Sequence, residues 1–304
     1  MHKVVVTGGS GFVGKRLQLV KPEWTYLSSK DVNLLDFKET KDYFQSINPD
    51  SVVHLAGKVG GIIDNLENPA DFFSQNARIN MNVVDACHEA NVPRMLASLS
   101  TCAFPDVAQK YPFDESTIFD GKPAHTNLSY GYSKRLMYVH INALRQQYGR
   151  NYSTFSPSNL YGPGDNFDLT SSHFVAAAIR KIAEAKDKVV FWGTGKPLRQ
   201  QLFVDDLCKI IPVLLTYHCC SKPLIVAPEE NLSIEEMVDI ILQVSKKDLE
   251  VVFNGKLDGQ LRKVGSNNSL VSLVENFKFT PFNKGVLSTY NWYLENEKSI
   301  YNRN

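Results

Sequence analysis

Cysteine is scarce in this sequence, and the few cysteines form no recognisable framework. The 304 residues include Cys87, Cys102, Cys208, Cys219 and Cys220, without a Cys-x-x-Cys pair. An odd, scattered set argues against structural disulfides and cysteine-based metal sites, and it is typical of a reducing compartment. We therefore expect a cytoplasmic protein that binds no metal.

Long apolar runs and an excess of charge of one sign are also missing. The Met-His-Lys start leads into an apolar run that is too short for a signal peptide. The most apolar helix candidate, Leu207 to Tyr217, contains Lys209 and Pro212 and is too short to span a bilayer. A formal net charge of +1 provides no overall field suited to nucleic acid or an anionic membrane, so we expect neither as a partner.

The first half of the chain alternates short apolar runs with amphipathic segments. This alternation implies right-handed crossovers and predicts an α/β fold with a Rossmann-type, doubly wound parallel sheet. Asp36, three residues before Glu39, has the spacing of a capping box. The expected strands are Lys3–Thr7, Trp24–Leu27, Ser51–Leu55, Met95–Leu99 and Tyr152–Ser156, and the expected helices begin at Phe12 or cover 36–47, 69–90 and 129–148.

The pattern becomes less regular after Pro157 and predicts a smaller C-terminal α/β lobe that binds substrate. We assign residues 1–160 to the nucleotide-binding domain, with interleaved later segments at about 190–217, and residues 161–304 mainly to the lobe. We expect the active site in the cleft between the two. The lobe's expected helices cover 172–185, 205–217 and 233–244, with another near the C-terminus, and its expected strands are Val189–Trp192, Leu224–Ala227 and Leu249–Phe253.

A glycine-rich segment lies between the first expected strand and the first expected helix. It reads Gly8-Gly9-Ser10-Gly11-Phe12-Val13-Gly14 and contains Gly-x-Gly-x-x-Gly. Such glycines permit a tight turn and let the backbone approach a pyrophosphate at a helix N-terminus. A glycine-rich turn that binds nothing is the alternative, and the flanking strand and helix disfavour it. We predict a dinucleotide cofactor here.

The end of the second expected strand favours NADP(H) over NAD(H). An acidic residue at this place binds the ribose 2′-hydroxyl of NAD and repels a 2′-phosphate. Here the segment reads Ser28-Ser29-Lys30-Asp31, so that Lys30 and the serine hydroxyls would attract the phosphate. In a shifted register Asp31 would supply the acid, and this alternative stays open.

A serine, a tyrosine and a lysine have the order of a carbonyl-reducing site. Tyr130 and Lys134 are four residues apart on an expected helix, and Ser100 follows the fourth expected strand. We predict that the lysine lowers the pKa of the phenol, which then donates a proton to a substrate carbonyl. Tyr-x-x-x-Lys is common by chance, so this prediction depends on its context.

These motifs resemble those of the extended short-chain dehydrogenase/reductase family. The residues that carry the resemblance are the glycine loop, His54-Leu55-Ala56, Ser100 and Tyr130-x-x-x-Lys134. Further blocks are similar to the GDP-L-fucose synthase group of that family, which couples 3,5-epimerisation to 4-reduction of a GDP-4-keto-6-deoxy sugar. These blocks begin at Lys58, Pro69, Asn159, Trp192 and Asp258, and the likeness extends to the helix around Trp292.

The resemblance implies a role for each matching position. Ser100, Tyr130 and Lys134 would form the reduction set, and Cys102 with His173 the epimerising acid/base pair. NADP(H) would contact the glycine loop and Lys30. The remaining implied positions are Leu99, Lys134, Pro157, Ser158, Asn159, Leu160 and His173 for the cofactor, and Lys181, Trp192, Arg199 and Asp258 for the GDP-sugar.

Less specific interpretations of these residues also exist. From position alone, Cys102 is a small core residue, His173 a helix-start residue, and Arg262 with Lys263 a solvated face. A UDP- or dTDP-sugar is an alternative substrate, and a non-catalytic NADP sensor is an alternative function. The family pattern further implies a homodimer through the helices at 69–90 and 129–148.

Overall fold

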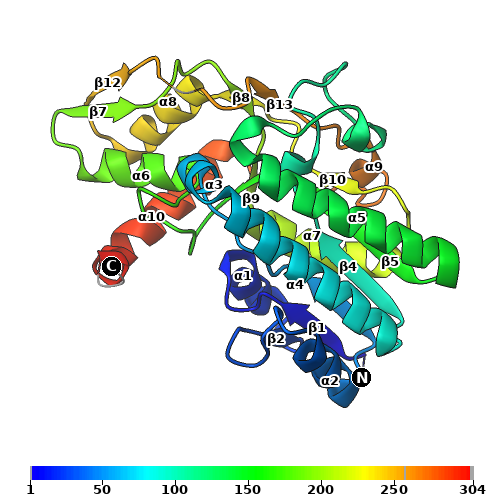
Figure 1. The fold of residues 1–304 in the computed structure, drawn as a ribbon. Coiled ribbons are helices and arrows are strands. Elements are labelled where there is room, and N and C mark those ends of the chain that lie inside the picture. Colours follow the sequence, from blue (N-terminus) through cyan, green and yellow to red (C-terminus); the bar gives the residue numbers. More distant parts are fainter. Residues whose placement is uncertain (1, 257, 302–304) are drawn as a thin grey trace.

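A parallel sheet forms the centre of the larger domain (Figure 1). The structure is a computed structural model that describes residues 2–256 and 258–301. Among these residues the sheet has six strands in the order β10-β5-β4-β3-β1-β2, each parallel to its neighbours. Their bounds are β1 Val4–Thr7, β2 Thr25–Leu27, β3 Ser51–His54, β4 Arg94–Ser98, β5 Asn151–Pro157 and β10 Leu224–Val226.

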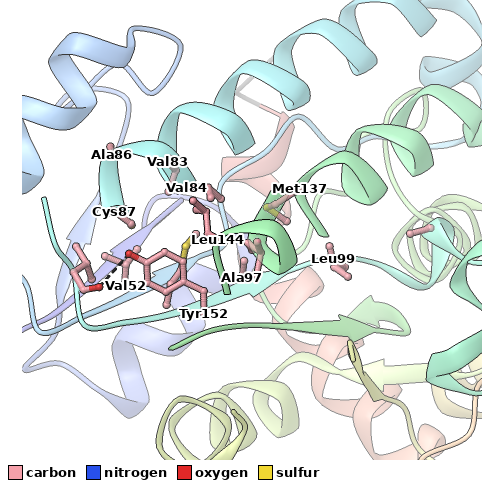
Figure 2. Close-up of a cluster of buried hydrophobic side chains, with 14 of the residues drawn as sticks. Val52, Val83, Val84, Ala86, Cys87, Ala97, Leu99, Met137, Leu144 and Tyr152 are labelled. Atoms are coloured by element: carbon pink, nitrogen blue, oxygen red, sulfur yellow. Dashed lines mark hydrogen bonds between the residues drawn. The ribbon is translucent and has the colours of Figure 1, made fainter. Parts of the chain in front are cut away.

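Helices cover both faces of this sheet, as expected of a doubly wound fold. α1 (Phe12–Val20) and α7 (Val204–Tyr217) pack on one face. α2 (Phe37–Ile47), α4 (Pro69–Glu89) and α5 (Leu128–Tyr148) pack on the other, where α4 and α5 lie side by side (Figure 1). Figure 2 shows Val83 and Val84 of α4 with Met137 of α5 above Val52 and Ala97 of the strands.

A smaller lobe follows, with its own core between helices and short strand pairs. In it β7 (Lys188–Phe191) pairs with β12 (Glu250–Phe253), and β8 (Leu198–Arg199) pairs with both β11 (Leu232–Ser233) and β13 (Arg262–Lys263). β6 (Asn159–Tyr161) pairs with β9 (Gln201–Phe203). The helices of this lobe are α6 Phe174–Glu184, α8 Ile234–Ser245 and α10 Phe282–Tyr301. Two short α-helices of the described chain remain: α3 (Ile62–Glu67) between β3 and α4, and α9 (Asn268–Val271) between β13 and α10.

The predicted fold class is confirmed, with local corrections. The segment Leu224–Ala227, expected in the smaller lobe, supplies edge strand β10 of the main sheet because it pairs with β5. The capping box at α2 is only half formed: the Asp36 carboxylate accepts the Glu39 backbone N–H at 2.9 Å, but the Glu39 carboxylate accepts from the Asn33 backbone N–H at 2.8 Å. In the described part of the chain, every helix is too short or too polar to cross a membrane.

Candidate active site

The glycine loop follows β1 at the carboxyl edge of the sheet. Gly8 has a φ of +75°, and a Cβ there would lie 2.8 Å from the Ala56 nitrogen. A Cβ at Gly14 would clash with the Gly8 carbonyl oxygen. Gly11 precedes α1, and no side chain caps the first turn of that helix. The first N–H groups of α1 are therefore left for an anionic ligand, and these residues fit a dinucleotide pyrophosphate.

The acidic residue after β2 is engaged in a turn. One carboxylate oxygen of Asp31 accepts the backbone N–H of Ser28 at 2.8 Å and its hydroxyl at 2.6 Å. These hydrogen bonds hold the pKa of the Asp31 carboxyl below its usual range. Lys30 is exposed beside this turn, where a 2′-phosphate would meet a positive charge.

The ends of β4 and β5 reach the same edge of the sheet. The Leu99 N–H donates to the Phe155 carbonyl at 2.7 Å, and the Ser158 N–H donates to the Val226 carbonyl at 2.9 Å. Pro157 ends β5, and Asn159 and Leu160 continue into β6. The predicted cofactor positions of these two segments therefore lie at one edge with the glycine loop, as parallel strands require.

A buried histidine fixes the geometry of that edge. His54 Nδ1 lies 2.7 Å from the Thr7 hydroxyl, and His54 Nε2 lies 3.1 Å from the Asn80 amide oxygen. Burial, with the charge of Lys134 in support, lowers the pKa of His54 to about 3, so the ring is neutral. The network joins β1 and β3 to α4, and it was not predicted because a lone Asn on a helix carries no local signal.

Ser100, Tyr130 and Lys134 come together where β4 ends. The Ser100 hydroxyl oxygen accepts the Cys102 N–H at 3.1 Å, which begins the short helix η1 (Thr101–Ala103). Lys134 Nζ donates to the Ser98 carbonyl at 2.9 Å and lies 5.8 Å from the centroid of the Tyr130 ring. Burial lowers the pKa of Lys134 to about 8.

The prediction that Lys134 lowers the phenol pKa is wrong for this structure. Burial, followed by the charge of Cys102, raises the pKa of Tyr130 above its ordinary value, and only a hydrogen bond with Ser100 opposes this. The Lys134 ammonium is hydrogen-bonded to a carbonyl and stands over the ring, away from a direct bond to the phenol. Tyr130 therefore keeps its proton at neutral pH, which suits a proton donor.

Cys102 has a charged partner, Lys263, that the sequence did not predict. Lys263 Nζ donates to the Cys102 sulfur at 2.9 Å and lies 3.4 Å from the Asn159 amide oxygen. Burial alone would raise the pKa of Cys102, but the charge and hydrogen bond of Lys263, helped by Ser100 and Asn127, hold it below its ordinary value. The alternative interpretation of a solvated face is thus wrong for Lys263, because β13 turns Lys263 inward and leaves Arg262 exposed.

His173 approaches from the smaller lobe. It is the residue before α6, and its side chain is exposed and makes no cap hydrogen bond. Desolvation by the nearby protein atoms is the larger cause that lowers the pKa of His173, and the charge of Lys263 is the second. The same ammonium therefore acts on Cys102 and on His173, which come from different parts of the chain.

Three of the four predicted sugar-binding residues lie at or beside the loop that follows Trp192. Lys181 Nζ lies 5.5 Å from the centroid of the Trp192 ring, which is 53% exposed. Asp258 accepts the Thr194 N–H at 2.9 Å and the Thr194 hydroxyl at 2.7 Å, so its carboxylate shapes the loop after Trp192.

Arg199 lies beside Lys263 and close enough to Asp258 to interact with its charge. The two residues are register partners of β8 and β13. Burial lowers the pKa of Arg199 to about 10 against the opposing charges of Cys102, Asp258 and Asp106. Arg199 and Lys263 are therefore neighbouring cations, and the guanidinium of Arg199 suits a diphosphate. No group of three or more His, Cys, Asp or Glu side chains within the described residues could hold a metal ion.

The fold and these grouped side chains define a dinucleotide-dependent enzyme, and the comparisons with known proteins agree. The model of the NAD dependent epimerase/dehydratase family matches residues 4–221. The chain therefore belongs to this family, within which its curated relatives are GDP-L-fucose synthases.

The relatives match the chain over nearly its whole length. The GDP-L-fucose synthase of Dictyostelium discoideum is 37% identical, over 96% of this chain and 95% of that protein. The enzyme of Escherichia coli is 34% identical, over 97% of this chain and 98% of its own. The crystal structure of a GDP-L-fucose synthetase from Naegleria fowleri bound to NADP superposes with a TM-score of 0.89 at 30% identity, covering 97% of this chain and 93% of that one.

Proposed function

We propose that this protein converts GDP-4-keto-6-deoxy-D-mannose to GDP-L-fucose as an NADPH-dependent 3,5-epimerase and 4-reductase. The observation that carries the proposal is the grouping of Ser100 and Tyr130 with Cys102, whose thiol is hydrogen-bonded to Lys263. Simple carbonyl reduction needs no thiol, whereas inversion beside a ketone needs an acid/base pair. The GDP-L-fucose synthase relatives support this combination.

The cofactor would be held by the glycine loop and by the segments that follow β4 and β5. When bound, NADPH supplies a hydride to a carbonyl carbon. The free N–H groups of α1 would bind its pyrophosphate, and Lys30 its 2′-phosphate. Ser10 and Gly11 of the glycine loop are exposed, and the Asp31 carboxylate is hydrogen-bonded to Ser28; both observations are compatible with this arrangement.

Epimerisation would use Cys102 and His173 on the sugar carbons next to the ketone. A thiol and an imidazole have ordinary pKa values of about 8.5 and 6.5. General acid/base catalysis is most efficient when the pKa of the catalytic group lies near the operating pH, and both groups meet this condition. The enolate oxygen that forms would accept hydrogen bonds from Ser100 and Tyr130. His173 reaches the cleft from the smaller lobe, so the two groups act from different directions.

Reduction would draw its proton from Tyr130. The raised pKa of the phenol keeps the proton in place until negative charge develops on the ketone oxygen. Lys134, buried beside it, would hold the cofactor ribose and limit the charge that accumulates. Arg199 would bind the diphosphate, and Lys181 of α6 would bind the rest of the nucleotide together with Trp192, which precedes the loop shaped by Asp258.

We further propose a cytoplasmic homodimer. Tyr132, Leu136 and Val139 are 40%, 38% and 52% exposed on α5, at spacings that place them on one face of the helix. Phe73 on the neighbouring α4 is 44% exposed. An apolar surface on this helix pair supports pairing with a second copy.

The test is product analysis with defined substrates. The protein is incubated with NADPH and GDP-4-keto-6-deoxy-D-mannose, and the sugar is identified by proton NMR. We expect GDP-L-fucose, together with a larger increase in Tm from the GDP-sugar than from its UDP or dTDP counterpart. Oxidation of NADPH only with a UDP- or dTDP-linked sugar would contradict the proposal.

A further inference from the structure

Lys263 is a buried cation without a carboxylate partner. Its side chain is 8% exposed, and the ion pairs of the described residues do not include it. The hydrogen bonds of its Nζ go to the Cys102 sulfur at 2.9 Å and to the Asn159 amide oxygen at 3.4 Å. Because burying an unpaired charge is costly, a cation in this position favours a negative charge next to it.

We propose that Lys263 is a positioning residue for epimerisation, because its ammonium holds the sulfur of Cys102 as the thiolate that removes the sugar proton. The inference rests on the proposed function and assigns this residue a part in it. Of the two atoms near Nζ, the sulfur is the one that can become an anion, since the Asn159 amide does not ionise.

The proton transfer that follows conserves charge. The thiolate takes the proton from a carbon next to the ketone, so the C–H bond breaks and an S–H bond forms. The electron pair moves into an enolate whose negative charge rests on the ketone oxygen. His173 returns a proton to the opposite face of that carbon to complete the inversion, the thiol and the imidazole then exchange protons with solvent, and Lys263 takes no part in the transfer.

The other groups that face Cys102 do not replace Lys263. Tyr130 of α5 is neutral, and Ser100 and Asn127 contribute only hydrogen bonds. Arg199 on β8 is close enough for its charge to interact with the thiol, but it donates to the Leu198 carbonyl at 2.8 Å. Burial is already the largest single influence on the thiol, and without Lys263 only the hydrogen bonds of Ser100 and Asn127 would oppose it, so the neutral form would be favoured.

The test measures thiolate formation directly, without any sugar. The full-length protein is treated with iodoacetamide across about pH 6 to pH 10, and alkylation of the Cys102 peptide is followed by mass spectrometry. We expect Lys263→Met to slow alkylation of Cys102 at neutral pH by about tenfold or more and to move its midpoint to higher pH, since one pKa unit changes the thiolate fraction about tenfold. Lys263→Arg, which keeps the charge, should restore most of the reactivity.

Controls come from the same chain. Arg262→Met removes the same charge from the exposed neighbour on β13 and should leave the Cys102 midpoint unchanged. Cys219 and Cys220 are exposed and should react alike in all variants. If Lys263→Met lacks the increase in Tm caused by NADPH, the same profile is measured on Lys263→Gln, whose amide can donate to sulfur without a charge.

The results distinguish a failure of the role of Lys263 from a failure of the proposed function. An unchanged Cys102 midpoint in a folded Lys263 variant would overturn the role of Lys263. The proposed function would be contradicted by a different result. In that result the alkylation midpoint of Cys102 is low and depends on Lys263, which supports the pairing of these two residues, but the sugar protons do not exchange.

Discussion

The two sets of side chains in this cleft are assembled in different ways. Ser100, Tyr130 and Lys134 follow β4 or lie on α5, so the larger domain alone brings them together. Cys102 is also there, but His173 stands at the start of α6 and Lys263 lies on β13, both in the smaller lobe. The residues proposed for reduction therefore come from one domain, while those proposed for epimerisation come from both parts of the molecule.

The largest effect should come from Tyr130→Phe, which tests whether reduction is separable. We expect turnover in reduction to fall by about a hundred- to ten-thousand-fold, because the proton donor is lost. NADPH affinity should stay close to that of the unmodified protein, and the measurements are steady-state kinetics and NADPH titration. Tyr132→Phe, an exposed tyrosine on the same helix, is the matched control. An equal loss of NADPH affinity would instead make Tyr130 structural.

A smaller effect should come from Lys30→Asp, which changes the proposed contact with the cofactor 2′-phosphate and leaves the residues proposed for catalysis unchanged. Losing a charged contact to the 2′-phosphate costs about 1.5–3 kcal/mol, so we expect the preference for NADPH over NADH to fall about ten- to a hundredfold. The readout is kcat/KM for each cofactor, with Lys284→Asp on α10 as the control. Similar efficiencies with both cofactors in the unmodified protein would contradict the assignment.

The smallest effect concerns stability and the His54 network of the larger domain. The pKa of His54 is lowered to about 3 in the folded protein, so the unfolded chain binds more protons below about pH 6.5. Stability from this group is complete above that pH and is lost as the pH falls toward 3. Urea unfolding should show about 1.4 kcal/mol lost through His54 at pH 5.5. His54→Gln should remove this loss and His125→Gln should retain it; equal pH dependence in all three proteins would contradict it.

The sequence predicted the larger domain better than the smaller lobe, for a physical reason. Strand and helix periodicity, the glycine loop and Tyr130-x-x-x-Lys134 are local signals, and the elements they predict are confirmed. Strand β10 was misplaced because Leu224–Val226 is three buried apolar residues that fit either sheet. Lys263 was missed because β13 is only two residues long, too short to show which residue is turned inward.

The electrostatics of the site were also not predictable from motif spacing. The same Tyr-x-x-x-Lys spacing is compatible with a lysine bonded to the phenol or to the Ser98 carbonyl, and the structure has the second arrangement. The roles of the individual site residues stay predictions until they are tested one by one.

The central claim is that epimerisation and reduction are separate functions of one cleft, and Cys102→Ala in heavy water tests it most directly. Mass and proton spectra of the sugar would report deuterium entering at carbons 3 and 5. We predict that exchange falls by about a hundred- to ten-thousand-fold, while NADPH still slowly reduces the unepimerised ketone to a 6-deoxy sugar of the other configuration. Exchange of both protons at the unmodified rate would contradict the account and leave Cys102 as a packing residue.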